Sequence, residues 1–331
     1  MPAMRLTARA LSYALTEPFV IARQVYTEAN VVQVEIASGW AVGRGEAAGV
    51  DYLGDTPQAM MKQLSALADA LADGTPLDRM ALLQRLPAGG ARNAVDCALW
   101  DLEAKLTGVP AALRAGLSPL KPVETFVTLG MDTPEAMGAK AARWSSHYAA
   151  LKVKLGDGQD MARLEAVRAA APRARLIADA NQGWTLDQLN ARAPRMAELG
   201  VELLEQPLPV GEDEALAGYV GAVPLCADES FDDRDDLDLI TGRYAFCNIK
   251  LDKCGGLTEA MALIEAARAR GLRLMVGCME GTSLGIAPAL LVAQGCEIVD
   301  LDCPMQLVRD IDGGFGYRDG WLRPNGPELW G

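Results

Sequence analysis

The feature that most constrains the fold is a series of short apolar segments, each followed by a stretch with helical periodicity, that begins near residue 121. Polar residues end successive apolar segments at intervals of 25, 26, 23 and 22 residues; they are Lys154, Asp179, Glu205, Asp228 and Lys250. A strand and its crossover helix fit within such an interval, and units of this kind build parallel sheets. The pattern therefore predicts an α/β protein.

Eight apolar segments of this kind are present, over residues 125–130, 150–156, 174–181, 201–207, 223–230, 246–252, 273–279 and 297–302. They lack the Gly-rich turn of an open dinucleotide-binding sheet, so we expect a closed (β/α)7β barrel of the TIM type. In such a barrel the carboxyl ends of all strands meet at one mouth, where active sites lie. Because the polar residues collect at that end, the mouth is the expected site.

Residues 1–120 follow a different pattern. Apolar and polar residues alternate over 30–39 and 40–47, which predicts a β-hairpin. A helix is then expected from an N-cap at Thr56 to a stop at Gly74, and a second one over residues 89–107. This region therefore reads as a separate α+β unit.

Composition excludes several classes of function. The chain has 44 acidic and 31 basic residues, a net charge of −13, which argues against nucleic-acid binding and against an anionic membrane surface. It shows neither a membrane span nor a signal peptide, and its seven cysteines form no CxxC pair, so we expect reduced cysteines in a cytoplasmic protein. With a single histidine, proton transfers would fall to lysines or carboxylates.

Three carboxylates end three successive predicted strands: Asp179, Glu205 and Asp228. Any one of them could instead cap a helix or lie in a solvated loop. Together they would repel one another unless a cation lay between them, and oxygen ligands of this kind suit Mg²⁺ better than zinc. The sequence thus predicts a site for one Mg²⁺ per subunit.

Lysines supply the second part of the predicted site. Lys152 and Lys154 are two residues apart on the second strand, so both can point to one side, and Lys250 ends the sixth strand. The second and sixth strands of an eight-stranded barrel face each other. A metal ion and a charged lysine such as Lys152 could stabilise an enolate formed next to a carboxylate. Two opposed lysine bases would then allow proton removal on one face and return on the other, which is racemisation or epimerisation.

These residues resemble the enolase superfamily, in particular its muconate-lactonising subgroup. The resemblance covers nearly the whole chain and is carried by a set of motifs: GRGEA (43–47), LKVKLG (151–156), DANQGW (179–184), EQPL (205–208), ADES (227–230) and NIKLDKCGG (248–256). It implies an α+β capping domain over 1–120, completed by segment 304–331, and a barrel catalytic domain over 121–303. It also implies an enzyme that can assemble into homo-oligomers.

Within that subgroup, Asp300 and Asp302 resemble the Asp-x-Asp signature of dipeptide epimerases. Two anions there can bind the free α-ammonium group of a dipeptide. The resemblance implies epimerisation at the α-carbon of the C-terminal residue, with L-Ala-D/L-Glu in peptidoglycan turnover as the expected substrate.

The same resemblance assigns further roles. Lys154 is expected to be the base for the (R)-configured centre and Lys250 for the (S)-configured centre, while Lys152 contacts the substrate carboxylate. Other expected substrate contacts lie in the capping segment, on the first strand and at the end of the seventh: Arg23, Thr128, Cys278 and Glu280. Arg23 would pair with a side-chain carboxylate. Glu280 either favours a cation or polar group on the first residue of the dipeptide or points outward.

Two alternatives stay open at this point. A lyase or cycloisomerase of the same subgroup, such as an o-succinylbenzoate synthase, would use the same metal and lysines but leave Asp300 and Asp302 without a role. A non-catalytic metal-binding barrel would need neither the lysines nor the aspartates.

Overall fold

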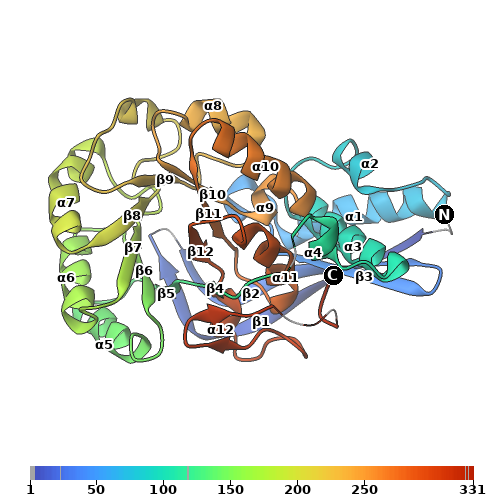
Figure 1. The fold of residues 1–331 in the computed structure, drawn as a ribbon, viewed down its shortest axis with the longest axis horizontal. Helices are drawn as coiled ribbons and strands as arrows, with labels where there is room; N and C mark the ends of the chain where they lie inside the picture. Colours follow the sequence, from blue (N-terminus) through green and yellow to red (C-terminus); the bar gives the residue numbers. More distant parts are fainter. Residues whose placement is uncertain (1–3, 23, 118, 325, 327) are drawn as a thin grey trace.

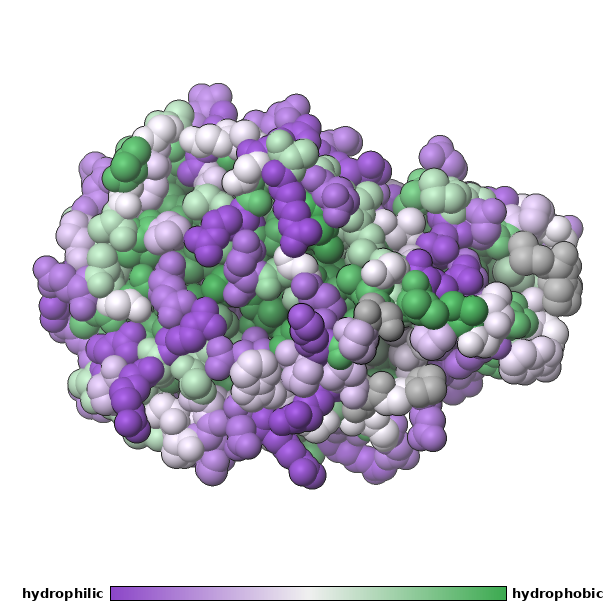
Figure 2. Space-filling view, viewed as in Figure 1, coloured by the Kyte–Doolittle hydropathy of each residue, from purple (hydrophilic) through white to green (hydrophobic). Residues whose placement is uncertain are grey.

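The computed structural model of the chain describes residues 4–22, 24–117, 119–324, 326 and 328–331. A barrel of strands and helices occupies one side of the molecule, and the N-terminal sheet with its helices extends from the other (Figure 1). Hydrophilic side chains cover most of the visible barrel surface, and apolar ones appear mainly in the recesses between them (Figure 2). Among the described helices, none is both long enough and apolar enough to cross a membrane.

The N-terminal sheet is antiparallel, in the order β1 (Met4–Ile21), β2 (Gln24–Ser38) and β3 (Ala41–Ala47). It contains the hairpin predicted from the alternating pattern, with Ser38 paired to Ala41 across the turn. The apolar side chains of β2 at Val32, Val34 and Ile36 are buried in one cluster with the adjacent helices, which fixes the face that the sheet turns inward.

The two predicted helices of this region are present as α1 (Pro57–Ala72) and α3 (Gly90–Thr107). Thr56 caps α1 by accepting a hydrogen bond from the backbone N–H of Ala59 at 3.3 Å, and Pro57 needs no such partner at the first position. Shorter elements complete the region: η1 (Asp51–Leu53), α2 (Arg79–Leu83) and α4 (Ala111–Arg114).

Glycine is required where β3 crosses α3. A Cβ atom on Gly43 would lie 2.0 Å from the carbonyl oxygen of Ala98 and 2.6 Å from the Cβ of Leu102, so backbone would have to move. We expect Gly43→Ala to lower the free energy of unfolding by about 3 kcal/mol, as overpacking in a core does. Gly158→Ala is the control, because its Cβ would meet no atom within 4 Å. Urea unfolding of both variants checks this; equal midpoints would contradict the packing described here.

The barrel is an eight-stranded parallel sheet, as the sequence predicts. Its strands in spatial order are β5 (Val127–Leu129), β6 (Ala150–Lys154), β7 (Arg175–Asp179), β8 (Val201–Glu205), β9 (Leu225–Ala227), β10 (Phe246–Ile249), β11 (Arg273–Gly277) and β12 (Ile298–Asp300). The two ends of the sheet meet where the N–H of Phe126 donates to the carbonyl of Val299 at 2.9 Å. The interior of the barrel is filled by a buried layer with one residue from within or just before each strand, among them Phe126, Ile177 and Phe246.

The crossovers are helical, with one exception. They contain α5 (Pro134–Trp144), α6 (Asp160–Ala170), α7 (Leu186–Glu198), η2 (Asp213–Leu216), η3 (Arg234–Asp236) with α8 (Leu237–Ile240), α9 (Leu251–Cys254) with α10 (Leu257–Ala269), and α11 (Ser283–Ala293). The crossover from β8 to β9 has only the 3₁₀ helix η2. Pro207, Pro209 and Gly211 precede η2, and residues of these types disfavour a longer helix.

The C-terminal segment returns to the N-terminal part of the chain. After α12 (Cys303–Gln306), β13 (Tyr317–Arg318) and β14 (Trp321–Leu322) form a small antiparallel sheet with β4 (Val123–Glu124). The indole N–H of Trp330 donates to the carbonyl of Cys97 on α3 at 3.0 Å, and the N–H of Gly331 donates to Asp101 at 2.8 Å. The last residues thus tie α3 to the rest of the structure.

Candidate active site

The polar side chains predicted from the sequence lie at one end of the barrel. Lys154, Asp179 and Glu205 are the last residues of β6, β7 and β8, and strand register places them side by side. Asp228 directly follows β9, and Lys250 directly follows β10. All five side chains are buried. The barrel therefore gathers these groups at its carboxyl end because parallel strands carry them to the same level.

Lys152 is the most enclosed of the three lysines. Its Nζ lies 2.6 Å from Glu205 Oε2, 2.8 Å from Asp300 Oδ2 and 3.2 Å from Asp179 Oδ2. Burial lowers the pKa of Lys152, but these three carboxylates raise it, and the net pKa lies well above its ordinary value. Lys152 is thus a fixed positive charge in this site.

Lys154 and Lys250 occupy opposite sides of the barrel mouth, because three strands separate β6 from β10 in either direction around the sheet. Lys154 Nζ lies 2.6 Å from Asp179 Oδ2, and Lys250 Nζ lies 2.8 Å from Asp228 Oδ2. Burial lowers the pKa of Lys250, while Asp228, above all, raises it to a net value well above the ordinary one. Both lysines line the same cavity, so a molecule in it would have an amine on each side.

The three carboxylates at the strand ends carry unequal charge compensation. Asp228 contacts two ammonium groups, those of Lys250 and of Lys253 at 2.7 Å. Burial raises the pKa of Asp228, but the two lysines hold it well below its usual value. Burial first, and then the charge of Asp179, raise the pKa of Glu205 to about 8. Burial and the neighbouring carboxylates thus oppose the ionised form of Glu205 more strongly than the lysines favour it.

The lysine ammonium groups reach between these carboxylates. In the part of the chain that the structure describes, no three acidic, histidine or cysteine side chains are oriented to share one ion. The three carboxylates nevertheless act on one another electrostatically, since Asp179 and Asp228 both raise the pKa of Glu205. Their oxygens are the donors that a hard divalent cation prefers, so the chemistry of the set fits such an ion.

The two predicted aspartates of the eighth strand both face Thr128. The N–H of Thr128 donates to Asp302 Oδ2 at 2.7 Å, and its hydroxyl lies 3.3 Å from both Asp300 Oδ1 and Asp302 Oδ1. Burial and the neighbouring Asp300 raise the pKa of Asp302 to about 7. Asp300 forms an ion pair with Lys152 at 2.8 Å, whereas Asp302 forms no ion pair with any residue that the structure describes, and Lys152 acts on it only at longer range.

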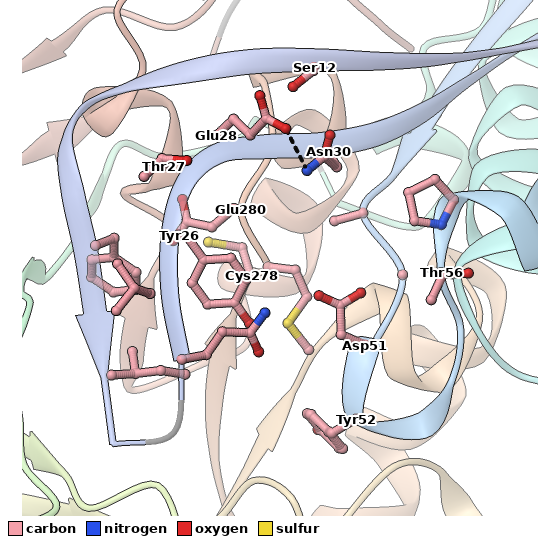
Figure 3. A pocket seen from close by; sticks show the side chains of 18 of the residues that line it. Ser12, Tyr26, Thr27, Glu28, Asn30, Asp51, Tyr52, Thr56, Cys278 and Glu280 are labelled. Carbon is pink, nitrogen blue, oxygen red and sulfur yellow. Dashed lines mark hydrogen bonds between the residues drawn. The ribbon is translucent and has the colours of Figure 1, made fainter.

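A cavity of about 800 Å³ opens above these groups, between the barrel mouth and the capping elements β1, β2 and η1 (Figure 3). Lys154, Lys250, Asp228, Cys278 and Glu280 line it from the barrel. Glu280 therefore faces the cavity, and its contact with a substrate stays a prediction. Six other predicted site residues do not line the cavity directly: Lys152, Asp179, Glu205, Thr128, Asp300 and Asp302. Arg23 lies outside the described residues.

Two supporting residues were not predicted from the sequence. The side-chain amide of Asn248 donates to Glu205 Oε1 at 2.7 Å. Gln206 accepts hydrogen bonds from the backbone N–H groups of Asp228 (2.9 Å) and Ser230 (3.1 Å), and its own backbone has a φ of +32°. Strained backbone of this kind concentrates at functional sites. The signal for Gln206 was its place beside Glu205 in EQPL.

Comparison with known proteins agrees with this geometry. The family model for the "Mandelate racemase / muconate lactonizing enzyme, N-terminal domain" matches residues 4–113, and "Enolase C-terminal domain-like" matches residues 136–327, more than half of the chain. The chain belongs to the enolase superfamily.

Relatives within this superfamily cover nearly the whole chain. The L-Ala-D/L-Glu epimerase of Escherichia coli K12 is 42% identical over 94% of this chain and 97% of its own. Among solved structures, an Agrobacterium tumefaciens enolase family member with homology to dipeptide epimerases, with bound sodium and L-Ala-L-Glu, is 45% identical at a TM-score of 0.96 and covers 99% of this chain and 100% of its own. The Enterococcus faecalis dipeptide epimerase, complexed with Mg and L-Leu-L-Tyr, is 28% identical at a TM-score of 0.92 over 100% of this chain and 99% of its own.

Proposed function

We propose that this protein is a Mg²⁺-dependent dipeptide epimerase that transfers a proton to and from the α-carbon of the C-terminal residue of L-Ala-D/L-Glu. The observation that carries the proposal is the placement of Lys154 and Lys250 on opposite sides of one cavity, above three buried carboxylates. The similarity to epimerases along the whole chain supports the same reaction.

Asp179, Glu205 and Asp228 would hold the ion, one per subunit. The fit is electrostatic: burial and the charge of Asp179 raise the pKa of Glu205 even though Lys152 lies 2.6 Å from it, and a divalent cation would supply further positive charge. When bound, Mg²⁺ would act as a Lewis acid toward the substrate carboxylate next to the reacting carbon. In the relative from Enterococcus faecalis, the complex contains Mg and a dipeptide.

The chain's own residues would then move the proton. Lys250 would remove the α-proton from the (S)-configured residue, and Lys154 would return a proton to the opposite face; in the reverse direction the two lysines exchange roles. The base must be neutral and its partner protonated at the start of each turnover; a cation bound by Asp228 would offset the carboxylate charge that raises the pKa of Lys250. Lys152 stays charged because three carboxylates surround it, and it would stabilise the negative charge of the enolate.

Asp300, Asp302 and Thr128 would bind the free α-ammonium group of the first residue. Asp302 fits this role best, because Lys152 already compensates Asp300. Arg23, predicted from the sequence to pair with the side-chain carboxylate of glutamate, stays a prediction.

Asp302 distinguishes an epimerase from a lyase of the same subgroup. We expect Asp302→Asn to lower kcat/KM for L-Ala-L-Glu by roughly 30-fold or more, since a buried charged partner of the ammonium is lost at a cost of 2 kcal/mol or more. A lyase whose substrate has no ammonium group should tolerate the change. Wild-type and variant kinetics with the dipeptide, and with the precursor of o-succinylbenzoate, would separate the two; rapid turnover of that precursor would contradict the proposal.

We also place the reaction in peptidoglycan turnover, because L-Ala-D-Glu occurs in the peptides of that polymer, and in the cytoplasm. All seven cysteines are free, which supports a reducing compartment.

The reaction itself is tested by deuterium uptake. Incubation of L-Ala-L-Glu with the Mg²⁺-loaded protein in D₂O should raise the mass of the dipeptide by one unit, at the α-carbon of glutamate. A panel of other dipeptides serves to rank specificity. If no member of the panel exchanges, the proposed function is wrong.

A further inference from the structure

Glu280 presents an unsatisfied carboxylate to the active-site cavity. It follows β11 and lines the cavity together with Cys278. Its Oε2 atom is buried and has no hydrogen-bond partner among the residues that the structure describes. Burial first, and then the charge of Asp302, raise the pKa of Glu280 to about 8. A buried carboxylate without a partner costs free energy, so a cation or a strong donor brought by a bound molecule would be favoured there.

Two residues of the capping elements face Glu280 across the same hollow. Figure 3 shows Tyr26 of β2 beside Glu280, with Asp51 of η1 on the other side of the space. Burial, followed by the charges of Asp51 and Glu280, raises the pKa of Tyr26 to about 12, which places both carboxylates within electrostatic range of the ring.

Among the described residues, positive charge does not balance this end of the cavity. Among its described lining residues, the cationic ones are Lys154 and Lys250, and each is paired to a carboxylate at a strand end. Glu280, Asp51 and the face of Tyr26 are thus left to a ligand. Carboxylates form their strongest hydrogen bonds with ammonium and guanidinium groups, and an aromatic face attracts the same cations.

We propose that Glu280, Asp51 and Tyr26 form a subsite for a cationic side chain on the first residue of the dipeptide. The proposal rests on the proposed epimerase function and extends its substrates from L-Ala-D/L-Glu to dipeptides with a cationic first residue. The assignment to the first residue follows from position: Glu280 interacts with Asp302, which would bind the α-ammonium group of that same residue, while the two lysines flank the α-carbon of the second. A lysine or arginine side chain would reach the carboxylates, whereas the methyl group of alanine would leave Glu280 unpaired.

A matched pair of substrates isolates the side-chain charge. L-Lys-L-Glu and Nε-acetyl-L-Lys-L-Glu have the same first-residue backbone and α-ammonium group, and only the former has a charged side chain. We expect kcat/KM for deuterium exchange to be at least ~10-fold higher for L-Lys-L-Glu, the size of one charged hydrogen bond.

Variants of the subsite residues test whether they cause the preference for L-Lys-L-Glu over Nε-acetyl-L-Lys-L-Glu. Glu280→Gln keeps the shape of the side chain and should reduce the ratio between the two lysine dipeptides to about 1–2. Asp51→Asn, at an exposed residue, should reduce it by a smaller factor and is available if the first variant folds poorly. Glu265→Gln, which removes the same charge from an exposed position of α10, should leave the ratio at its wild-type value.

The outcomes separate the two proposals. If L-Ala-L-Glu exchanges but the wild-type ratio is close to 1, or if Glu280→Gln retains the wild-type ratio, the cationic subsite is wrong and the epimerase function stands. If none of the three dipeptides exchanges, the epimerase function fails and the subsite with it.

Discussion

Replacing Lys250 with alanine is expected to lower the rate of deuterium exchange into L-Ala-L-Glu by about 10³-fold, while exchange into L-Ala-D-Glu stays measurable. Lys154→Ala should show the reverse preference. The reason is geometric: each lysine reaches only one face of the α-carbon, because the two side chains enter the cavity from opposite strands. The remaining lysine can still remove the proton from its own face and return deuterium there. Net epimerisation should be lost in both variants.

Lys62→Ala is the control for this pair, because Lys62 is exposed on α1, away from the barrel. The Lys62→Ala variant should catalyse deuterium exchange into both epimers at the wild-type rate. Equal loss of exchange from both epimers in each variant, with folding intact by circular dichroism, would contradict two separate bases.

Removing the divalent cation is expected to have an effect of similar size. Chelation should lower the exchange rate by about 10³-fold or more, because the enolate charge would lose its main stabilising cation, and added Mg²⁺ should restore the rate. Binding should also be visible without catalysis. Mg²⁺ at a hundred times its Kd would stabilise the folded protein by about 2.7 kcal/mol, which is measurable as a rise in Tm.

Glu205→Gln tests the ion's position. The substitution removes a carboxylate whose pKa is raised to about 8, so the variant should be at least as stable as the wild type without metal. It should nevertheless lose the Mg²⁺-dependent rise in Tm and most of the exchange activity. Glu265→Gln should keep both. A full Mg²⁺ shift in Glu205→Gln would show that the ion binds elsewhere.

The parts of the fold that follow from local pattern could be predicted from the sequence. The barrel strands carry short apolar runs with polar residues at or just after their carboxyl ends, so the sequence alone predicts that Asp179, Glu205 and Lys250 lie at one mouth. Helix α1 could also be predicted from the sequence, because Thr56 and Pro57 mark its start.

What could not be predicted depends on contacts between distant segments. Tyr26 and Asp51 line the cavity only because the capping elements pack over the barrel mouth. The ion pair between Lys152 and Asp300 joins residues 148 positions apart, and it makes the two aspartates of the Asp-x-Asp motif unequal, which is why we propose Asp302 as the main partner of the ammonium group. Asn248 shows no sequence signal for its hydrogen bond to Glu205.

In the proposed reaction, two lysines move protons on opposite faces of one α-carbon. The most direct measurement follows L-Ala-L-Glu in D₂O with the Mg²⁺-loaded protein, resolving the two epimers and the mass of each at early times. We predict that L-Ala-D-Glu forms and carries one deuterium from its first appearance, while the remaining L-Ala-L-Glu gains label more slowly. Deuterium entering L-Ala-L-Glu without formation of the D-epimer, or no exchange at saturating Mg²⁺, would contradict the claim.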